Sequence, residues 1–386
     1  MTVKLAGSRR LAGVAAISAL ALTLAACGGD SSGSEAGGDD GGEQTEEGGD
    51  DGEAMDLSGE LPGAGASTQE NAMAGWIAGF NEQYPDVAVN YDPVGSGSGR
   101  EQFISGATLF GGSDSHFSEE ELEQASERCF GGEVLELPMY ISPIAVAYNL
   151  PDVGVENLNI TPDALAGIFN GDITSWDDPA IADENPDANL PSTEITPVHR
   201  SDESGTTENF TEYLHEAAPD TWTDEASETW PIQGGQSGAQ TSGVVQVLES
   251  AEGTIGYVDA SQVPEGMGTV AIGVGEEFVP YSAEAAAAVV DASPMTDDAT
   301  DLRLTFELDR ATQESGVYPI VLVSYDFACS TYDDESDANN VAEFLRYVAS
   351  EEGQERAADP SVAGSAPISD DLRSQIEAAI DQIGVA

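Results

Sequence analysis

Two long apolar segments, far apart in the sequence, set the frame for any fold of this chain. The first covers residues 134–149 and carries Pro138 and Pro143 inside it, and the second covers residues 318–325. Internal prolines and nearly continuous apolar character favour buried extended strands over helices. The 329 residues beyond Leu57 are enough for two domains with separate cores. We therefore expect two lobes with two extended strands crossing between them.

Strand-like and helix-like patterns alternate around these two segments. Strand patterns cover residues 87–91, 110–114 and 253–258, and helical patterns cover 72–80, 100–106, 161–183, 206–216, 338–352 and 370–383. Ser67 or Thr68 is placed to cap the first helix, and residues 95–99 are expected to form a glycine–serine loop. This order predicts an α/β fold with ligand-facing loops at strand ends, in the form of a hinged clamshell.

The N-terminal residues have the pattern of an export signal. Residues 1–26 join a basic start to an apolar run that is too short to remain as a membrane-spanning helix. The tetrad ending in Cys27 resembles the bacterial lipobox, in which the cysteine becomes the mature N-terminus and carries lipid such as palmitate. We expect an extracytoplasmic protein anchored to the cell membrane by this lipid alone. An ordinary signal peptide with an incidental cysteine is the alternative.

The charge of the mature chain is strongly negative. Removing Lys4, Arg9 and Arg10 leaves 8 of the 11 basic residues against 72 acidic ones, a net charge of −64. Residues 27–57 contain 11 of the acidic residues and no basic one, so we expect an acidic, glycine-rich disordered tether. Such charge disfavours nucleic acid and anionic membranes as partners. The absence of lysine favours a halophilic acidic surface, with a merely acidic mesophilic protein as the alternative.

Two cysteines, Cys129 and Cys329, remain after Cys27. In an exported chain they are most simply interpreted as one disulfide, and two buried free thiols are the alternative. Neither the cysteines nor the three histidines have the spacing of metal ligands. The sequence therefore predicts neither a metal site nor a cofactor.

The scarce arginine at position 200 begins a stretch that is suited to an oxyanion. Arg200 precedes Asp202 and a Ser204–Thr206 run that resembles a helix start. A guanidinium group beside hydroxyls and free backbone N–H groups can hold a tetrahedral oxyanion. Three further segments place small hydroxyl residues at helix starts or an acid at a strand end: Ser67–Thr68, Ser96 and Asp114. Together they predict an anion site.

These motifs, in this order, resemble the substrate-binding lipoprotein of the bacterial phosphate ABC transporter. The motifs that carry the likeness are Gly63–Ser67, Gly95–Gly99, Gly112–Asp114 and Arg200–Thr206, with flanking agreement over 168–176 and 253–258. The resemblance implies a type II periplasmic-binding-protein clamshell that holds phosphate between its lobes. Lobe I would comprise residues 58–148 plus 318–386, and lobe II residues 149–317.

The resemblance also implies a ligand set. By position, the phosphate-binding residues would be Ser67, Thr68, Ser96, Asp114, Arg200, Ser204, Gly205 and Thr206. Asp202 would orient Arg200. Asp114 would accept the proton that phosphate keeps near neutral pH, which fully ionised sulfate lacks. The acid therefore predicts selectivity for phosphate.

The implied function is capture of inorganic phosphate by a monomer that is not an enzyme, and its delivery to ABC permease subunits and their ATPase. The alternatives are the same clamshell for sulfate, molybdate or tungstate, and a secreted phosphatase using Ser204. A triad of Ser204, His199 and Asp202 is disfavoured, because no nucleophile elbow surrounds the serine. Arg100 either caps its helix or pairs with an acid across the hinge.

Overall fold

The computed structural model describes residues 57–386. The expected signal peptide, Cys27 and the expected tether as far as residue 56 lie outside the described residues, whereas Leu57 is buried. Residues 57–386 belong to one compact unit. None of the helices in the described range combines the length and the apolar character that a membrane crossing requires.

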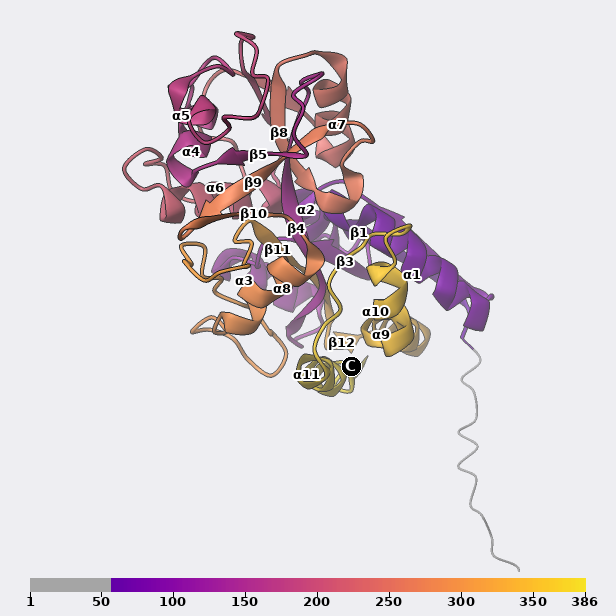
Figure 1. The fold of residues 1–386 in the computed structure, drawn as a ribbon. Coiled ribbons are helices and arrows are strands. Elements are labelled where there is room, and N and C mark those ends of the chain that lie inside the picture. Colours follow the sequence, from indigo (N-terminus) through magenta and orange to yellow (C-terminus); the bar gives the residue numbers. More distant parts are fainter. Residues whose placement is uncertain (1–56) are drawn as a thin grey trace, which may run out of the picture. The chain divides into compact units, whose positions relative to one another are not determined.

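An eleven-stranded mixed sheet forms the frame of the described chain (Figure 1). Its strands are β1 (Gly59–Gly65), β2 (Val87–Asp92), β3 (Phe110–Ser113), β4 (Val134–Tyr148), β5 (Asn157–Ile160), β6 (Thr196–Arg200), β7 (Gln236–Gly238), β8 (Thr254–Asp259), β9 (Gly268–Val274), β10 (Glu277–Pro280) and β11 (Val321–Cys329). The main path runs β2-β1-β3-β11-β4-β8-β6-β7, and β9 carries β5 and β10 beside β4. A separate parallel pair joins β12 (Thr331–Tyr332) to β13 (Gly384–Val385).

Helices follow most strands, which confirms the predicted α/β class. They are α1 (Glu70–Gln83), α2 (Ser96–Ile104), α3 (Glu119–Arg128), α4 (Pro162–Asn170), α5 (Pro179–Ala182), α6 (Gly205–Ala217), α7 (Gln240–Ser250), α8 (Ala283–Ala292), α9 (Glu335–Ala349), α10 (Glu351–Ala358) and α11 (Asp370–Ile380), with 3₁₀ turns η1 (Ser67–Gln69) and η2 (Ala260–Gln262). In Figure 1, α4 to α7 gather around β5 and β8, whereas α1, α9 and α10 lie on the side of β1 and β3, and α11 lies near β12.

Strand β4 belongs to both parts of the sheet. Residues 134–143 pair with β11 and residues 144–148 pair with β8, both antiparallel. All fifteen residues of this strand are buried, including Pro138 and Pro143. We call β1, β2, β3, β11 and residues 134–143 the first half of the sheet, and residues 144–148 with β5 to β10 the second half. The first apolar segment of the sequence is therefore a strand that crosses between the halves.

The segment between the second half and β11 makes contacts with the first half. Helix α8 packs against β4 and β11. Further along, Leu304 N donates to Glu136 O, and Arg303 pairs with the Glu136 carboxylate at 2.8 Å. The expected boundary of the lobes at residue 317 stays a prediction.

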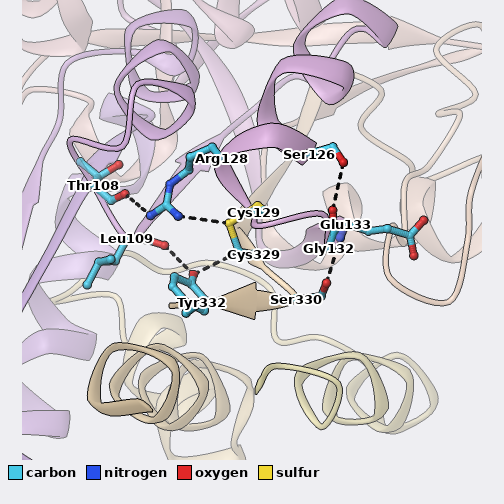
Figure 2. The surroundings of a disulfide bond; sticks show 10 residues. All are labelled: Thr108, Leu109, Ser126, Arg128, Cys129, Gly132, Glu133, Cys329, Ser330 and Tyr332. Carbon is cyan, nitrogen blue, oxygen red and sulfur yellow. Dashed lines mark hydrogen bonds between the residues drawn. A yellow bond between two sulfur atoms is a disulfide. The ribbon is translucent and has the colours of Figure 1, made fainter. Parts of the chain in front are cut away.

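The predicted disulfide is confirmed, since Cys129 is bonded to Cys329. It joins the end of α3 to the end of β11 (Figure 2). Arg128 beside it donates to Thr108 O and lies over the rings of Phe103 and Tyr332. The bond thus fixes a surface helix to the first half of the sheet.

Candidate functional site

Helix starts from both halves of the sheet meet around Asp114, the residue that follows β3. Gly205, the first residue of α6, is so close that a Cβ atom on it would lie 2.7 Å from the Asp114 Cβ atom. Gly95, which precedes α2 with a φ of 102°, would place a Cβ atom 2.8 Å from Asp202 Oδ2. The first turn of a helix exposes unpaired N–H groups and the positive end of its dipole. This convergence therefore favours an anion.

The Asp114 carboxylate is buried and accepts three hydroxyl groups. Thr68 donates to Oδ1 over 2.8 Å and Ser324 donates to the same oxygen over 2.7 Å. Thr206 donates to Oδ2 over 3.0 Å, which leaves acceptor capacity on that oxygen. Burial raises the pKa of Asp114, while these three hydroxyls and the charge of Arg200 oppose the rise. A protonated anion could give its hydrogen to the remaining lone pair.

Arg200 ends β6 and is almost completely buried. Its Nε atom donates to Asp202 Oδ1 over 2.9 Å and Nη2 pairs with Oδ2, so Nη1 stands outside the pair. Burial would raise the pKa of Asp202, but hydrogen bonds from Arg200 and its charge outweigh burial and lower it. Gln240 N, at the start of α7, also donates to Asp202. The carboxylate therefore fixes the guanidinium group and moderates its charge.

Ser96 and Ser204 lie at the starts of α2 and α6. Ser96 Oγ accepts from the backbone N–H of Asp114, and Ser204 Oγ accepts from Thr207 N as the N-cap of α6. Each hydroxyl therefore keeps its own proton for another acceptor. Helix α2 begins at Ser96, which confirms the helix start expected at this serine, whereas the loop expected over residues 95–99 was wrong.

The expected capping of α1 by Ser67 or Thr68 was also wrong. Helix α1 begins after η1 and has no side-chain cap. Thr68 instead faces Asp114, and Ser67 Oγ lies 2.9 Å from Thr241 Oγ1 and accepts from Thr241 N. These hydroxyls form hydrogen bonds with residues in distant parts of the chain and not with the first turn of their own helix. The contact with Thr241 joins the two halves of the sheet.

Sequence reasoning missed several residues that support the site. Ser324 supports Asp114, Thr241 contacts Ser67, and Tyr257 Oη accepts from Arg200 N. Ser324 carried a signal, because it is a polar residue inside a strongly apolar segment. Thr241 carried none, since its partner lies 174 positions away.

Arg100 joins the two halves beside the site. Its guanidinium group binds both oxygens of Glu228 at 3.0 and 2.7 Å, and Nε binds Glu121 at 2.9 Å. Burial would lower the pKa of Arg100, but the two carboxylates outweigh it and raise the pKa. Of the two roles left open for Arg100, the structure shows pairing with an acid across the halves.

A cavity of about 650 Å³ reaches Asp114 from the side of this ion pair. Asp114 is the one member of the expected ligand set that lines it. Five glutamates also line it: Glu121, Glu203, Glu208, Glu212 and Glu228. Because these carboxylates would repel an anion, the helix starts around Arg200 are the better anion site. Within residues 57–386, no group of three or more His, Cys, Asp or Glu side chains could hold a metal ion.

Known proteins resemble this chain over most of its length. Residues 42–352 match the family model of the PBP superfamily domain. Phosphate-binding protein PstS2 of Mycobacterium bovis (strain BCG / Pasteur 1173P2) is 34% identical over 386 residues, covering 97% of this chain and 99% of that protein. Phosphate-binding protein PstS 3 of Mycobacterium tuberculosis (strain ATCC 25618 / H37Rv) is 32% identical over 377 residues, covering 96% and 98%.

Solved structures show the same fold. The high affinity periplasmic phosphate-binding protein PfluDING, bound with phosphate, superimposes with a TM-score of 0.66 at 19% identity. The match covers 83% of this chain and 93% of that one. The two-lobe fold expected from the sequence is therefore confirmed.

Proposed function

Because this chain belongs to the PstS phosphate-binding proteins of the PBP superfamily, we propose that it captures inorganic phosphate outside the cytoplasm for an ABC importer. The observation that carries the proposal is the pairing of a buried acceptor, Asp114, with a buried cation, Arg200. The cation favours an anion, and the acceptor favours an anion that still carries a proton. Phosphate meets both conditions near neutral pH.

Short-range donors do most of the binding. Hydroxyls of Ser67, Ser96 and Ser204 and the backbone at Thr68, Gly205 and Thr206 would donate to the phosphate oxygens. Arg200 adds a charged donor through Nη1, while Asp202 keeps the guanidinium group in place. Such an arrangement tolerates a negative protein, because hydrogen bonds inside a closed site are not screened by salt.

The same geometry argues against the alternatives. Sulfate, molybdate or tungstate without a proton would bring negative charge to Asp114 with no hydrogen bond to offset it. Ser204 caps α6, and His199 uses its Nδ1 on the neighbouring carbonyl oxygen of Arg200. The serine therefore lacks a general base from this histidine, and we assign the protein transport rather than catalysis.

The remaining features of the proposal concern the context of the chain. We propose that lipid on Cys27 anchors a monomer to the cell membrane, and that ABC permease subunits and their ATPase receive the phosphate. Residues 58–148 plus 318–386 would form lobe I, and residues 149–317 lobe II. The acidic surface without lysine supports adaptation to concentrated salt.

Tryptophan fluorescence tests the function, because Trp230 stacks on His199, the neighbour of Arg200. The mature chain is titrated with phosphate, sulfate and molybdate at fixed ionic strength. We expect a saturable change with phosphate alone, reduced in W230F. An equal response to sulfate or molybdate, or no response to phosphate, would contradict the proposal. Release of product from a chromogenic phosphate ester would favour a phosphatase.

A further inference from the structure

Asp326 is a second buried carboxyl group close behind the site. It lies in β11, two residues after Ser324, and it is fully buried. Neither of its oxygens has a hydrogen-bond partner among the described residues. An unpaired buried carboxylate is costly, so the group requires an explanation.

Gln69 connects this carboxyl group to Asp114. Its Nε2 atom donates to Ser324 Oγ over 2.7 Å, and Ser324 must therefore direct its single proton to Asp114. The other end of the Gln69 amide, Oε1, is buried and without a partner in residues 57–386. That oxygen lies over Gly112, which pairs with Asp326 between β3 and β11.

Gln69 Oε1 and the Asp326 carboxylate are therefore two acceptors without donors, and both lie beside the pair of Gly112 and Asp326. Gln69 lowers the pKa of Asp326, although the two side chains make no aligned hydrogen bond. Burial is the larger effect and raises this pKa to about 7. A proton on the carboxyl group would convert one acceptor into a donor and satisfy both residues.

We infer that Asp326 is a neutral acid that donates to Gln69 Oε1, and that it thereby positions Ser324 and, through Ser324, the phosphate acceptor Asp114. Asp326 is a positioning residue, since it reaches the site only through Gln69 and Ser324. The inference rests on the proposed phosphate function. It assigns a role to a residue that lies outside the expected ligand set.

Ionisation of Asp326 should weaken phosphate binding. Its proton would leave to solvent, and the charge left behind would attract Nε2 of Gln69 and repel Oε1. The amide would turn, Ser324 would donate to Oε1, and Asp114 would lose one of its three hydroxyl donors. A new negative charge would also stand behind Asp114, where a second anion must bind.

The titratable groups that face Asp326 offer it no opposite charge. Tyr91 from β2 is partly buried, and desolvation of its phenol group, followed by the charges of Asp326 and Asp114, raises its pKa well above the usual value. It therefore stays neutral while Asp326 titrates. Asp114 itself is an acid. Phosphate affinity should therefore fall as pH rises through the titration of Asp326.

The test compares the wild type with D326N in calorimetric titrations with inorganic phosphate from pH 5.5 to 8.5 at fixed salt. Asparagine keeps the shape of the acid and can donate to Gln69, but it cannot ionise. We expect equal dissociation constants at pH 5.5 and a wild-type constant about tenfold higher than that of D326N at pH 8.5. The ionisation of phosphate itself is common to both proteins and cancels in the ratio.

The connection through Gln69 is tested in a Q69L background. In that background, the ratio of the dissociation constants without and with the D326N substitution should change little with pH. If the ratio still rises fully with pH, the connection from Asp326 through Gln69 to Ser324 is overturned. A ratio that does not change with pH in the native background would overturn the inference as a whole, whereas loss of phosphate binding by every protein would overturn the proposed function.

Carbon-13 NMR of the aspartate side chains follows the titration of Asp326 directly, with its signal assigned as the one that is missing from D326N. Asp259 is also buried and has a pKa raised to about 6, so this assignment is needed. The Asp326 signal should titrate near pH 7 and respond to added phosphate. If that carboxyl group is already ionised at pH 5.5, the inference is wrong.

Discussion

The hydroxyl of Thr206 donates to Oδ2 of Asp114 over 3.0 Å, and this hydrogen bond joins the second half of the sheet to the first. Thr68 donates to the other carboxylate oxygen from the same half as Asp114. The set of donors to this acid is therefore complete only when the two halves are together. Closure of the site and choice of anion depend on the same side chain.

Replacing Asp114 with asparagine should admit sulfate. The amide removes the negative charge that opposes sulfate and can itself donate a hydrogen bond, so discrimination should fall from about a thousandfold to within tenfold. Calorimetric titration with both anions measures this ratio. D92N alters an exposed acid at the end of β2 and serves as the control. If sulfate binding by D114N stays undetectable, our account of selectivity is wrong.

Replacing Thr206 with valine should weaken phosphate binding about tenfold or more, because Asp114 loses a donor that stabilises its charged form. Loss of this donor raises the pKa of Asp114. Binding should therefore be lost at a higher pH than in the wild type as the solution is acidified. T207V is the matched control, since the Thr207 hydroxyl contacts Tyr257 instead. Equal pH profiles for the two variants would contradict the role of Thr206.

Replacing Glu228 with glutamine should speed the release of phosphate by about tenfold, because the ion pair with Arg100 joins the halves only through this acid. Stopped-flow fluorescence gives the dissociation rate. E121Q removes the other carboxylate from the same arginine but leaves the contact between halves intact. If the ion pair helps to hold the halves together, E228Q should release phosphate faster than E121Q. Equal dissociation rates for the two variants would contradict this role.

The stability of the protein should depend on pH through Asp326. In an unfolded chain an aspartate titrates near pH 4, whereas burial raises the pKa of Asp326 to about 7. Between these values the folded state binds a proton that the unfolded state has lost, so stability falls as pH rises and levels above pH 7. D326N should lack this loss, which is on the order of 4 kcal/mol. Urea unfolding measures the free energy of unfolding of both proteins from pH 4 to 7. If the values for the wild type and D326N change with pH in the same way, the prediction is wrong.

Phosphate affinity should stay nearly constant, or improve, as ionic strength rises. Long-range repulsion by the acidic protein is screened within about 3 Å at 1 M salt, while the hydrogen bonds of a closed site are not. Titrations in increasing sodium chloride measure this dependence. A steep fall in affinity would show that long-range attraction holds the ligand.

The fold class was predictable because its signals are local or extend over long segments. Apolar residues 134–149 specified β4, and helical spacing specified α1 through Trp76 and Phe80, which are both buried. The start of α2 was not predictable in this way, because a glycine-rich segment has low helix propensity. Gly99 is needed there for contact: a Cβ atom on it would lie 2.4 Å from Gly65 Cα. Tertiary packing therefore overrides local preference.

The ligand set came from resemblance, and the connections within it came from the structure. Nothing local in the sequence indicates whether the Thr68 hydroxyl caps a helix or binds Asp114, 46 positions away. The same holds for Ser67 and Thr241. Asp326 directly follows the apolar segment 318–325 and was not singled out from the sequence, because its connection through Gln69 depends on a partner 255 positions from Ser324.

The use of one strand, β4, by both halves of the sheet gives the hinge an elastic character. Strand β4 is paired with β11 along one part and with β8 along the other, so it cannot lengthen when the halves move apart. It can accommodate such a movement mainly by twisting. We therefore expect the empty protein to open through a narrow range of angles, with a restoring force toward closure. Little conformational freedom would then remain to be lost when phosphate binds, which favours tight binding without any further contact.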